Sequence, residues 1–311
     1  MKTPVLLIAF NRPNYTRQML NALKISNVEN LLVFRDGPRP MNNHDKVACE
    51  EVKNLVENID WQCSVKTNFM NNNLGCGWGP FTAISWAFQY TDRLIILEDD
   101  CIPVPAFFPF CEYLLEKYKD NNNVRHISGY SQFPESKVFN SYDYIFTQYA
   151  PTWGWATWKR VWDNFDLQER LIQPFFKGGG FTNQFATKRE AKFFNDYYWR
   201  RPNPLFEVTH SWDYQYAVHS KMNGALSIVP AKNLIQYIGE EGTHPADQSY
   251  YKLKTSNNFI IKREPQDIML DAEYEMTYFE KYCSVPFLRR IKFALILFKN
   301  RLFGRPDFKV K

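Results

Sequence analysis

No cysteine pair in this sequence has the spacing of a metal or redox motif. The six cysteines are scattered, none forms a CxxC pair, and no cluster of cysteine and histidine has zinc-site spacing. A chain of 311 residues can build a full core without disulfides. We therefore expect reduced thiols in a cytoplasmic protein.

Long apolar runs and a large excess of one charge are also missing. The apolar run Val5–Phe10 has six residues, and no run reaches the ~18 residues of a membrane-spanning helix. Thirty-eight Lys and Arg against 33 Asp and Glu give a net charge of +5, which does not suggest a nucleic-acid partner. The 45% of apolar residues is typical of a globular protein.

Short, continuous apolar runs are present, and they are typical of strands buried on both faces. The three runs Val5–Phe10, Leu31–Phe34 and Leu94–Leu97 are therefore expected to be strands, and a further strand is expected at Ser64–Asn68. Amphipathic segments of helical length lie between them, at Tyr15–Lys24, Lys46–Asn58 and Pro80–Tyr90. This alternation predicts an α/β fold with a mostly parallel sheet, in which ligands bind beyond the carboxyl ends of the strands.

Polar residues follow three of these predicted strands. They are Asn11-Arg12-Pro13, Arg35-Asp36-Gly37-Pro38 and Glu98-Asp99-Asp100. Three adjacent carboxylates are costly to bury without a cation, so the last group predicts a divalent-metal or ribose site. The alternative is a solvated acidic turn or a helix cap. A loop at Asn71–Gly79 matches no nucleotide fingerprint, but its N–H groups could approach a ligand closely.

Seven motifs occur along the chain in the order of one enzyme family. They are PVLLIAFNRP (4–13), FRDGPR (34–39), NNLGCGWG (72–79), IILEDDCIP (95–103), WGWATWKRVW (153–162), SWDYQ (211–215) and GTH (242–244). The set resembles the GT-A glycosyltransferases, which use nucleotide-diphosphate sugars. It is similar to bacterial inverting members for surface polysaccharides and, more distantly, to N-acetylglucosaminyltransferase I. A strict DxD motif is absent, and EDD stands in its place.

The resemblance implies a Rossmann-like GT-A fold and a metal-dependent inverting hexosyltransferase. Its donor would be a nucleotide-diphosphate sugar of UDP type, and its acceptor a glycan or lipid-linked glycan. Residues 1–285 would form the enzyme domain, with a nucleotide-sugar half (1–135) and an acceptor half (136–285).

The resemblance also implies roles for single residues at the donor site. Phe10, Asn11, Arg12 and Gly75 would line the nucleotide pocket, Asp36 would contact the base, and Asp99 would face the ribose. Asp100 and His244 would hold Mn2+ or Mg2+ against the diphosphate. For the Asn-Arg-Pro turn, for Asp36 and for His244, an ordinary turn or loop residue remains the alternative.

An inverting transfer needs a base for the acceptor hydroxyl. The resemblance gives this role to Asp213, which matches the family's Trp-Asp pair, with Glu207 and Asp196 in reserve. We expect Asp213 to lie in the acceptor half, away from the acidic triplet. The alternative is an acid in the first turn of a helix.

Trp153 and Trp155 are the residues of the 153–158 cluster expected to be exposed, as a platform for a sugar. Packing in the core is the alternative. Residues 286–311 read as a basic amphipathic helix, which predicts a peripheral position on the inner membrane or a helix docked on the core. Two other functions stay open, a catalytically degenerate sugar-binding scaffold and a sugar nucleotidyltransferase.

Overall fold

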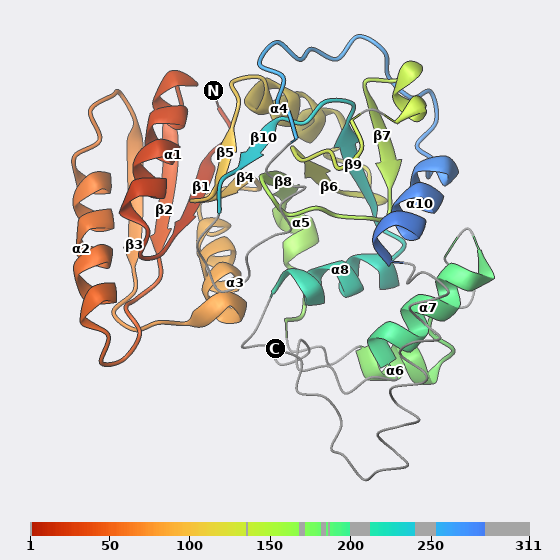
Figure 1. The fold of residues 1–311 in the computed structure, drawn as a ribbon, viewed down its shortest axis with the longest axis horizontal. Helices are drawn as coiled ribbons and strands as arrows, with labels where there is room; N and C mark the ends of the chain where they lie inside the picture. Colours follow the sequence, from red (N-terminus) through yellow and green to blue (C-terminus); the bar gives the residue numbers. More distant parts are fainter. Residues whose placement is uncertain are drawn as a thin grey trace.

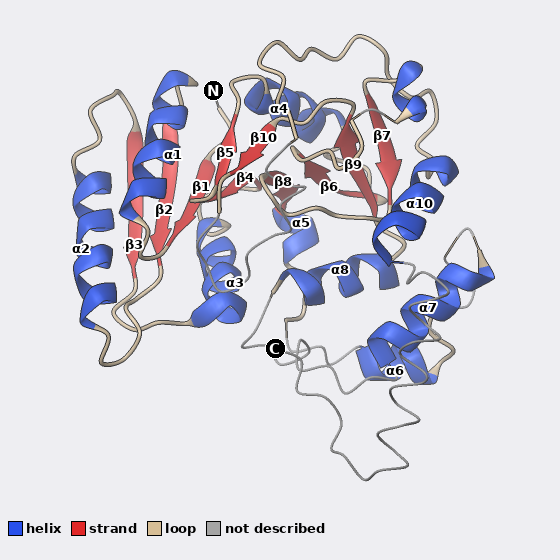
Figure 2. Ribbon diagram, in the orientation of Figure 1, coloured by secondary structure: helices blue, strands red, loops and turns tan. Residues whose placement is uncertain are grey.

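The computed structural model describes residues 2–134, 136–167, 172–181, 185, 187–199, 212–239 and 253–283. In this part of the chain, eight strands form one sheet with helices on both faces (Figure 1, Figure 2). The sheet order is β3-β2-β1-β4-β8-β6-β9-β7. The strands are β1 (Val5–Ala9), β2 (Asn30–Arg35), β3 (Ser64–Phe69), β4 (Arg93–Glu98), β6 (Val124–Ser128), β7 (Tyr144–Thr147), β8 (Trp155–Trp158) and β9 (Leu226–Pro230).

Six of the eight strands run in one direction, and β8 and β7 run in the other. The prediction of an α/β fold with a mostly parallel sheet is therefore confirmed. A separate two-stranded ribbon pairs β5 (Cys101–Pro103) with β10 (Ile235–Tyr237). This ribbon brings a late part of the chain to the residues that follow β4.

The helices of the described chain lie in two layers. They are α1 (Pro13–Ile25), α2 (Asn43–Glu57), α3 (Gly75–Ala87), α4 (Phe107–Lys117), α5 (Lys159–Trp162), α6 (Ile172–Lys177), α7 (Lys188–Trp199), α8 (Asp213–Met222) and α10 (Ala272–Tyr278), with a 3-10 turn at Lys137–Asn140 and a π turn at Phe279–Cys283. None of them is long and apolar enough to cross a membrane.

Alternation along β1 explains why both faces of the sheet are covered. Leu7 packs into a core with Met19 and other residues of α1, α2 and α4. Leu6 points to the opposite face and packs with Ile84 of α3 and Trp212 beside α8. Successive side chains of a strand point to opposite faces, so a continuous apolar run needs a helix layer on each side.

Two elements differ from the prediction. Helix α3 begins at Gly75 rather than at Pro80, so half of the expected loop is helical. Trp155–Trp158 forms a central strand, β8, which pairs antiparallel with β4 and β6. Because β8 comes from the second half of the chain, both halves contribute strands to one sheet.

Candidate functional site

The candidate site lies where the direction of the chain across the sheet reverses. From β1 the chain moves to β2 and then β3 on one side, and it then crosses to β4 on the other side of β1. In open α/β sheets, ligands bind outside the carboxyl ends of the strands at such a switch point. Here the ends of β1, β2 and β4 carry the three polar groups singled out from the sequence.

Arg12 joins the ends of β1 and β4. Its Nη1 donates to Oδ2 of Asp100 at 2.8 Å, and its Nη2 donates to Oδ1 of Asp99. Asp99 is 1% exposed and Asp100 is 7% exposed. Two buried carboxylates therefore share one guanidinium, which offsets part of the cost of their burial.

The acidic triplet is strongly perturbed. Burial, together with the negative charges of Asp100 and Asp213, raises the pKa of Glu98. Burial also raises the pKa of Asp99, although the charge of Arg12 opposes it. Burial alone would lower the pKa of Arg12, but the adjacent carboxylates raise it. The cluster therefore favours binding of an additional positive charge, either a proton or a cation.

Two carboxylate oxygens of this cluster lack a strong hydrogen-bond donor among the described residues. Oδ2 of Asp99 is buried without a hydrogen-bond partner in the described chain, and Oδ1 of Asp100 accepts only the weak Cys101 thiol donor at 3.3 Å. No group of three protein ligands occurs among the described residues. The residues fit a hard divalent ion that takes most of its ligands from phosphate and water.

Asp213 is close to the acidic triplet, contrary to the expectation that it lies away from it. It is the first residue of α8, and its charge contributes to the raised pKa of Glu98. The Trp212 ring stacks on the Trp155 ring, with centroids 5.6 Å apart. Since Trp155 pairs with Ile96 of β4, this stack holds the start of α8 near the end of β4.

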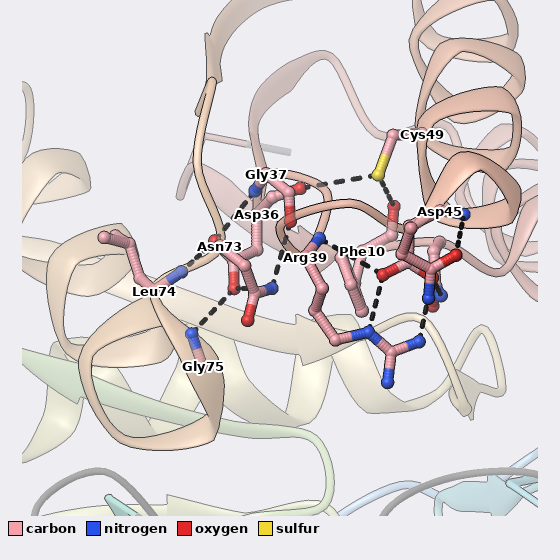
Figure 3. A network of polar contacts seen from close by, with 11 residues as sticks. Phe10, Asp36, Gly37, Arg39, Asp45, Cys49, Asn73, Leu74 and Gly75 are labelled. Atoms are coloured by element: carbon pink, nitrogen blue, oxygen red, sulfur yellow. Dashed lines mark hydrogen bonds and ion pairs between the residues drawn. The ribbon is translucent and has the colours of Figure 1, made fainter.

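Asp36 is fully engaged by its own chain. Its Oδ1 accepts the N–H groups of Gly37 and Leu74, both at 2.8 Å, and its Oδ2 accepts Asn73 Nδ2 at 2.9 Å and the Gly75 N–H at 3.1 Å (Figure 3). These four donors fill the four lone-pair positions of a carboxylate. Asp36 thus caps α3 from a different element, and no lone pair remains for the base contact expected from the sequence.

The same cap explains the early start of α3. Gly75 has a φ of 77°, which only glycine adopts readily. Gly79 packs beside the Asp36 carboxylate, where an added Cβ would lie 3.3 Å from Oδ2. The glycines therefore bring the helix start against Asp36.

A second network, which sequence reasoning missed, centres on Asp45 at the start of α2. The Asp45 carboxylate is fully buried and accepts Arg39 Nε at 2.5 Å, Arg39 Nη2 at 2.8 Å and Asn11 Nδ2 at 2.8 Å. Its backbone N–H donates to the side chain of Asn42, the cap of α2. The Asn-x-x-Asp spacing signals only the cap, and nothing in the sequence pairs Asp45 with Arg39.

The two tryptophans have different surroundings. Trp155 is 1% exposed and stacks on His126 as well as on Trp212, so the expectation that it is exposed to a sugar is wrong. Trp153 is half-buried and stacks on Tyr237, with centroids 4.6 Å apart. This pair lies near the triplet, because Ile238 donates its N–H to the Asp100 carbonyl oxygen at 2.9 Å.

Several expected site residues lie outside the described part of the chain. They are His244 and Glu207, and the 286–311 tail lies there too. Asp196 belongs to α7, but its side chain is not among those described. All six cysteines are free thiols, as expected.

Comparisons with known proteins show only distant structural likeness. No protein-family model and no curated protein matches the sequence, so the resemblance to N-acetylglucosaminyltransferase I has no support there. The galactosyltransferase LgtC, crystallised with donor and acceptor sugar analogues, aligns over 93% of this chain and 100% of its own, with 10% identity and a TM-score of 0.38.

Two nucleotidyl-transferring enzymes also align. UDP-glucose pyrophosphorylase with UDP-glucose covers 47% of this chain and 63% of its own, with 12% identity and a TM-score of 0.27. The 4-diphosphocytidyl-2C-methyl-D-erythritol synthase from Anaerococcus prevotii covers 64% and 97%, with 10% identity and a TM-score of 0.34. Sequence identities and TM-scores this low assign no family or activity to this chain.

Proposed function

We propose that the protein is a glycosyltransferase that moves a sugar from a nucleotide-diphosphate donor to a glycan or lipid-linked glycan. The observation that carries the proposal is the Arg12-bridged pair of Asp99 and Asp100 at the switch point of the sheet. The ordered motifs of the sequence support the reaction class, and the charged residues at the strand ends support the binding of a diphosphate.

The acidic pair supports binding of the donor diphosphate through a divalent ion. Asp100 would hold Mn2+ or Mg2+ together with the diphosphate oxygens, and the ion would stabilise the charge of the leaving group. Asp99 would face the ribose. Asn11 and Arg12, which follow β1, and Gly75, the first residue of α3, would line the nucleotide pocket.

Asp213 is the proposed base for the acceptor hydroxyl. Its charge acts on Glu98, which supports this role, because a base for a single displacement has to lie near the sugar of the donor. Attack from the face opposite the diphosphate would invert the anomeric carbon. The half-exposed Trp153, stacked on Tyr237, would give the sugar an apolar surface to pack against.

A screen of nucleotide-diphosphate sugars with Mn2+ or Mg2+ tests the proposal. We expect release of a nucleoside diphosphate from one donor class, increased by acceptor, and lost in Asp100→Ala. Release of pyrophosphate from a nucleoside triphosphate and a sugar phosphate would instead identify a nucleotidyltransferase. Binding of sugar nucleotides without turnover would favour the degenerate scaffold.

A further inference from the structure

Arg39 has a buried anchor and an exposed end. The fully buried Asp45 accepts hydrogen bonds from Nε and Nη2, and the Arg39 Cζ lies 5.7 Å from the centroid of the Phe10 ring. Nη1 has no partner among the described residues, and the Arg39 side chain is 53% exposed. Figure 3 shows the third guanidinium nitrogen directed away from the network.

This arrangement fixes the direction of one free donor. A planar guanidinium that is held at two nitrogens by one carboxylate has little freedom left. Contact with the Phe10 ring restricts it further. Nη1 is therefore directed away from Asp45 before any ligand arrives.

Arg39 and the acidic pair come after strands on opposite sides of β1. Asn11 donates to Asp45, which holds Arg39, and its neighbour Arg12 donates to Asp99 and Asp100. The two groups follow β2 and β4, which flank β1. At a spacing of ~4.8 Å between neighbouring strands, β2 and β4 end about 10 Å apart. A nucleoside diphosphate can extend over such a distance, with its phosphates at the acidic end and its base at Arg39.

We propose that Arg39 reads the base of the donor through Nη1. The inference rests on the proposed nucleotide-sugar function. A guanidinium only donates hydrogen bonds. In the proposed pose Nη1 meets O4 of uracil or O6 of guanine, the position at which cytosine and adenine carry an amino group that cannot accept. Asp36 would otherwise offer an acceptor near this end of the ligand, but its lone pairs are all used.

Calorimetric titration of the full chain with UDP, CDP, GDP and ADP in Mg2+ tests this assignment. We expect the keto member of one pair, UDP over CDP or GDP over ADP, to bind about tenfold more tightly, the discrimination typical of one charge-assisted hydrogen bond. The two pairs show whether the base is a pyrimidine or a purine. Arg39→Met should reduce this preference to less than about threefold, while inorganic pyrophosphate binds as before.

Arg17→Met is the matched control, because Arg17 is an exposed arginine of α1 and its loss removes the same charge. Arg39→Lys is the second variant, since it keeps a charge beside Asp45 but loses the planar fork, and it should also lose the preference. A preference that persists in both Arg39 variants would overturn the inference, as would an equal loss of affinity for all four nucleotides and pyrophosphate. If wild-type protein binds none of these nucleotides, the proposed function fails first.

Discussion

Arg12 is the residue on which the acidic site depends most. It forms ion pairs with both Asp99 and Asp100, which are almost completely buried. Buried carboxylates without a counter-charge either destabilise the fold or take up protons. This side chain, which we propose to line the nucleotide site, therefore also holds the ends of β1 and β4 together.

Replacing Arg12 by Met should lower the free energy of unfolding by about 3 kcal/mol at pH 8, because it leaves two buried charges uncompensated. The loss should be smaller at pH 5, where the carboxyl groups can take up protons. Urea unfolding of wild type and Arg12→Met at both pH values measures this loss of stability, with Arg17→Met as the control. Equal stability of Arg12→Met and wild type at pH 8 would show that the pair contributes nothing to the fold.

Asp213→Asn tests the proposed base. The amide keeps the shape of the side chain but removes its basicity, so the transfer rate should fall roughly 10²–10⁴-fold. The affinity for the donor should change little. The rate with a cognate acceptor decides the role of Asp213, and the coupling constant of the new anomeric proton decides the stereochemistry. A near-wild-type rate would move the role to Glu207 or Asp196, and a retained configuration would reject single displacement.

At the scale of elements, the strands at the site could be predicted from the sequence. The start of helix α3 and the residue that caps it could not. The continuous apolar runs were sufficient to predict β1, β2 and β4, because a strand buried on both faces admits few polar residues. The start of α3 was placed five residues late, since its cap, Asp36, is 38 residues from Leu74 in sequence. A cap supplied by another element leaves no local signal.

Strand β8 was missed for a different reason. Its sequence, WATW, is mainly tryptophan, and tryptophan clusters occur in cores as well as on ligand platforms. Because Trp155 is buried between His126 and Trp212, it belongs to the core and not to a ligand platform. The same stack places Asp213 near Glu98, so the missed strand also explains the wrong expectation for Asp213.

His126, on β6 beside β8, should make the fold sensitive to acid. Burial lowers its pKa to about 3, whereas an unfolded histidine has a pKa of about 6.5. The unfolded state therefore binds the additional proton, and stability falls as the pH drops below about 6.5. Lowering the pH from 7 to 5 should reduce the free energy of unfolding by about 2 kcal/mol through this residue alone.

The comparison of wild type with His126→Gln isolates this contribution. Urea unfolding of both proteins at pH 7 and pH 5 gives the two differences in stability. The glutamine variant should lose about 2 kcal/mol less on acidification. Identical losses in the two proteins would mean that His126 is accessible to protons in the folded state.

At the scale of the whole molecule, the fold class followed from the order of strands and helices, whereas the site depends on contacts between distant segments. Asn11 with Asp45, and Arg12 with Asp99 and Asp100, join residues that are far apart in sequence and that no local pattern relates. A second region, a cavity of about 620 Å³, lies away from these residues and includes Asp143, Lys232 and Arg263 in its lining. It serves as the comparison region for the measurement below.

The tail of residues 286–311 remains a proposed membrane-binding segment, because its sequence combines an apolar face with many Arg and Lys residues. Deleting it should reduce binding to anionic liposomes, and added salt should weaken the binding of the intact protein. Co-sedimentation at low and high salt measures both effects. Failure of the intact chain to bind anionic liposomes at low salt would leave the docked-helix alternative.

The central claim is that the nucleotide sugar binds at the carboxyl ends of β1, β2 and β4. Amide chemical-shift mapping tests it most directly, with 15N-labelled full-length protein, Mg2+ and the nucleotide sugar that the screen selects. We predict that the shifts concentrate at Phe10–Arg12, at Gly75–Gly77 and at Glu98–Cys101, and that they disappear in Asp100→Ala. Shifts confined to the cavity beside Asp143 and Arg263, with the strand ends unperturbed, would contradict the account.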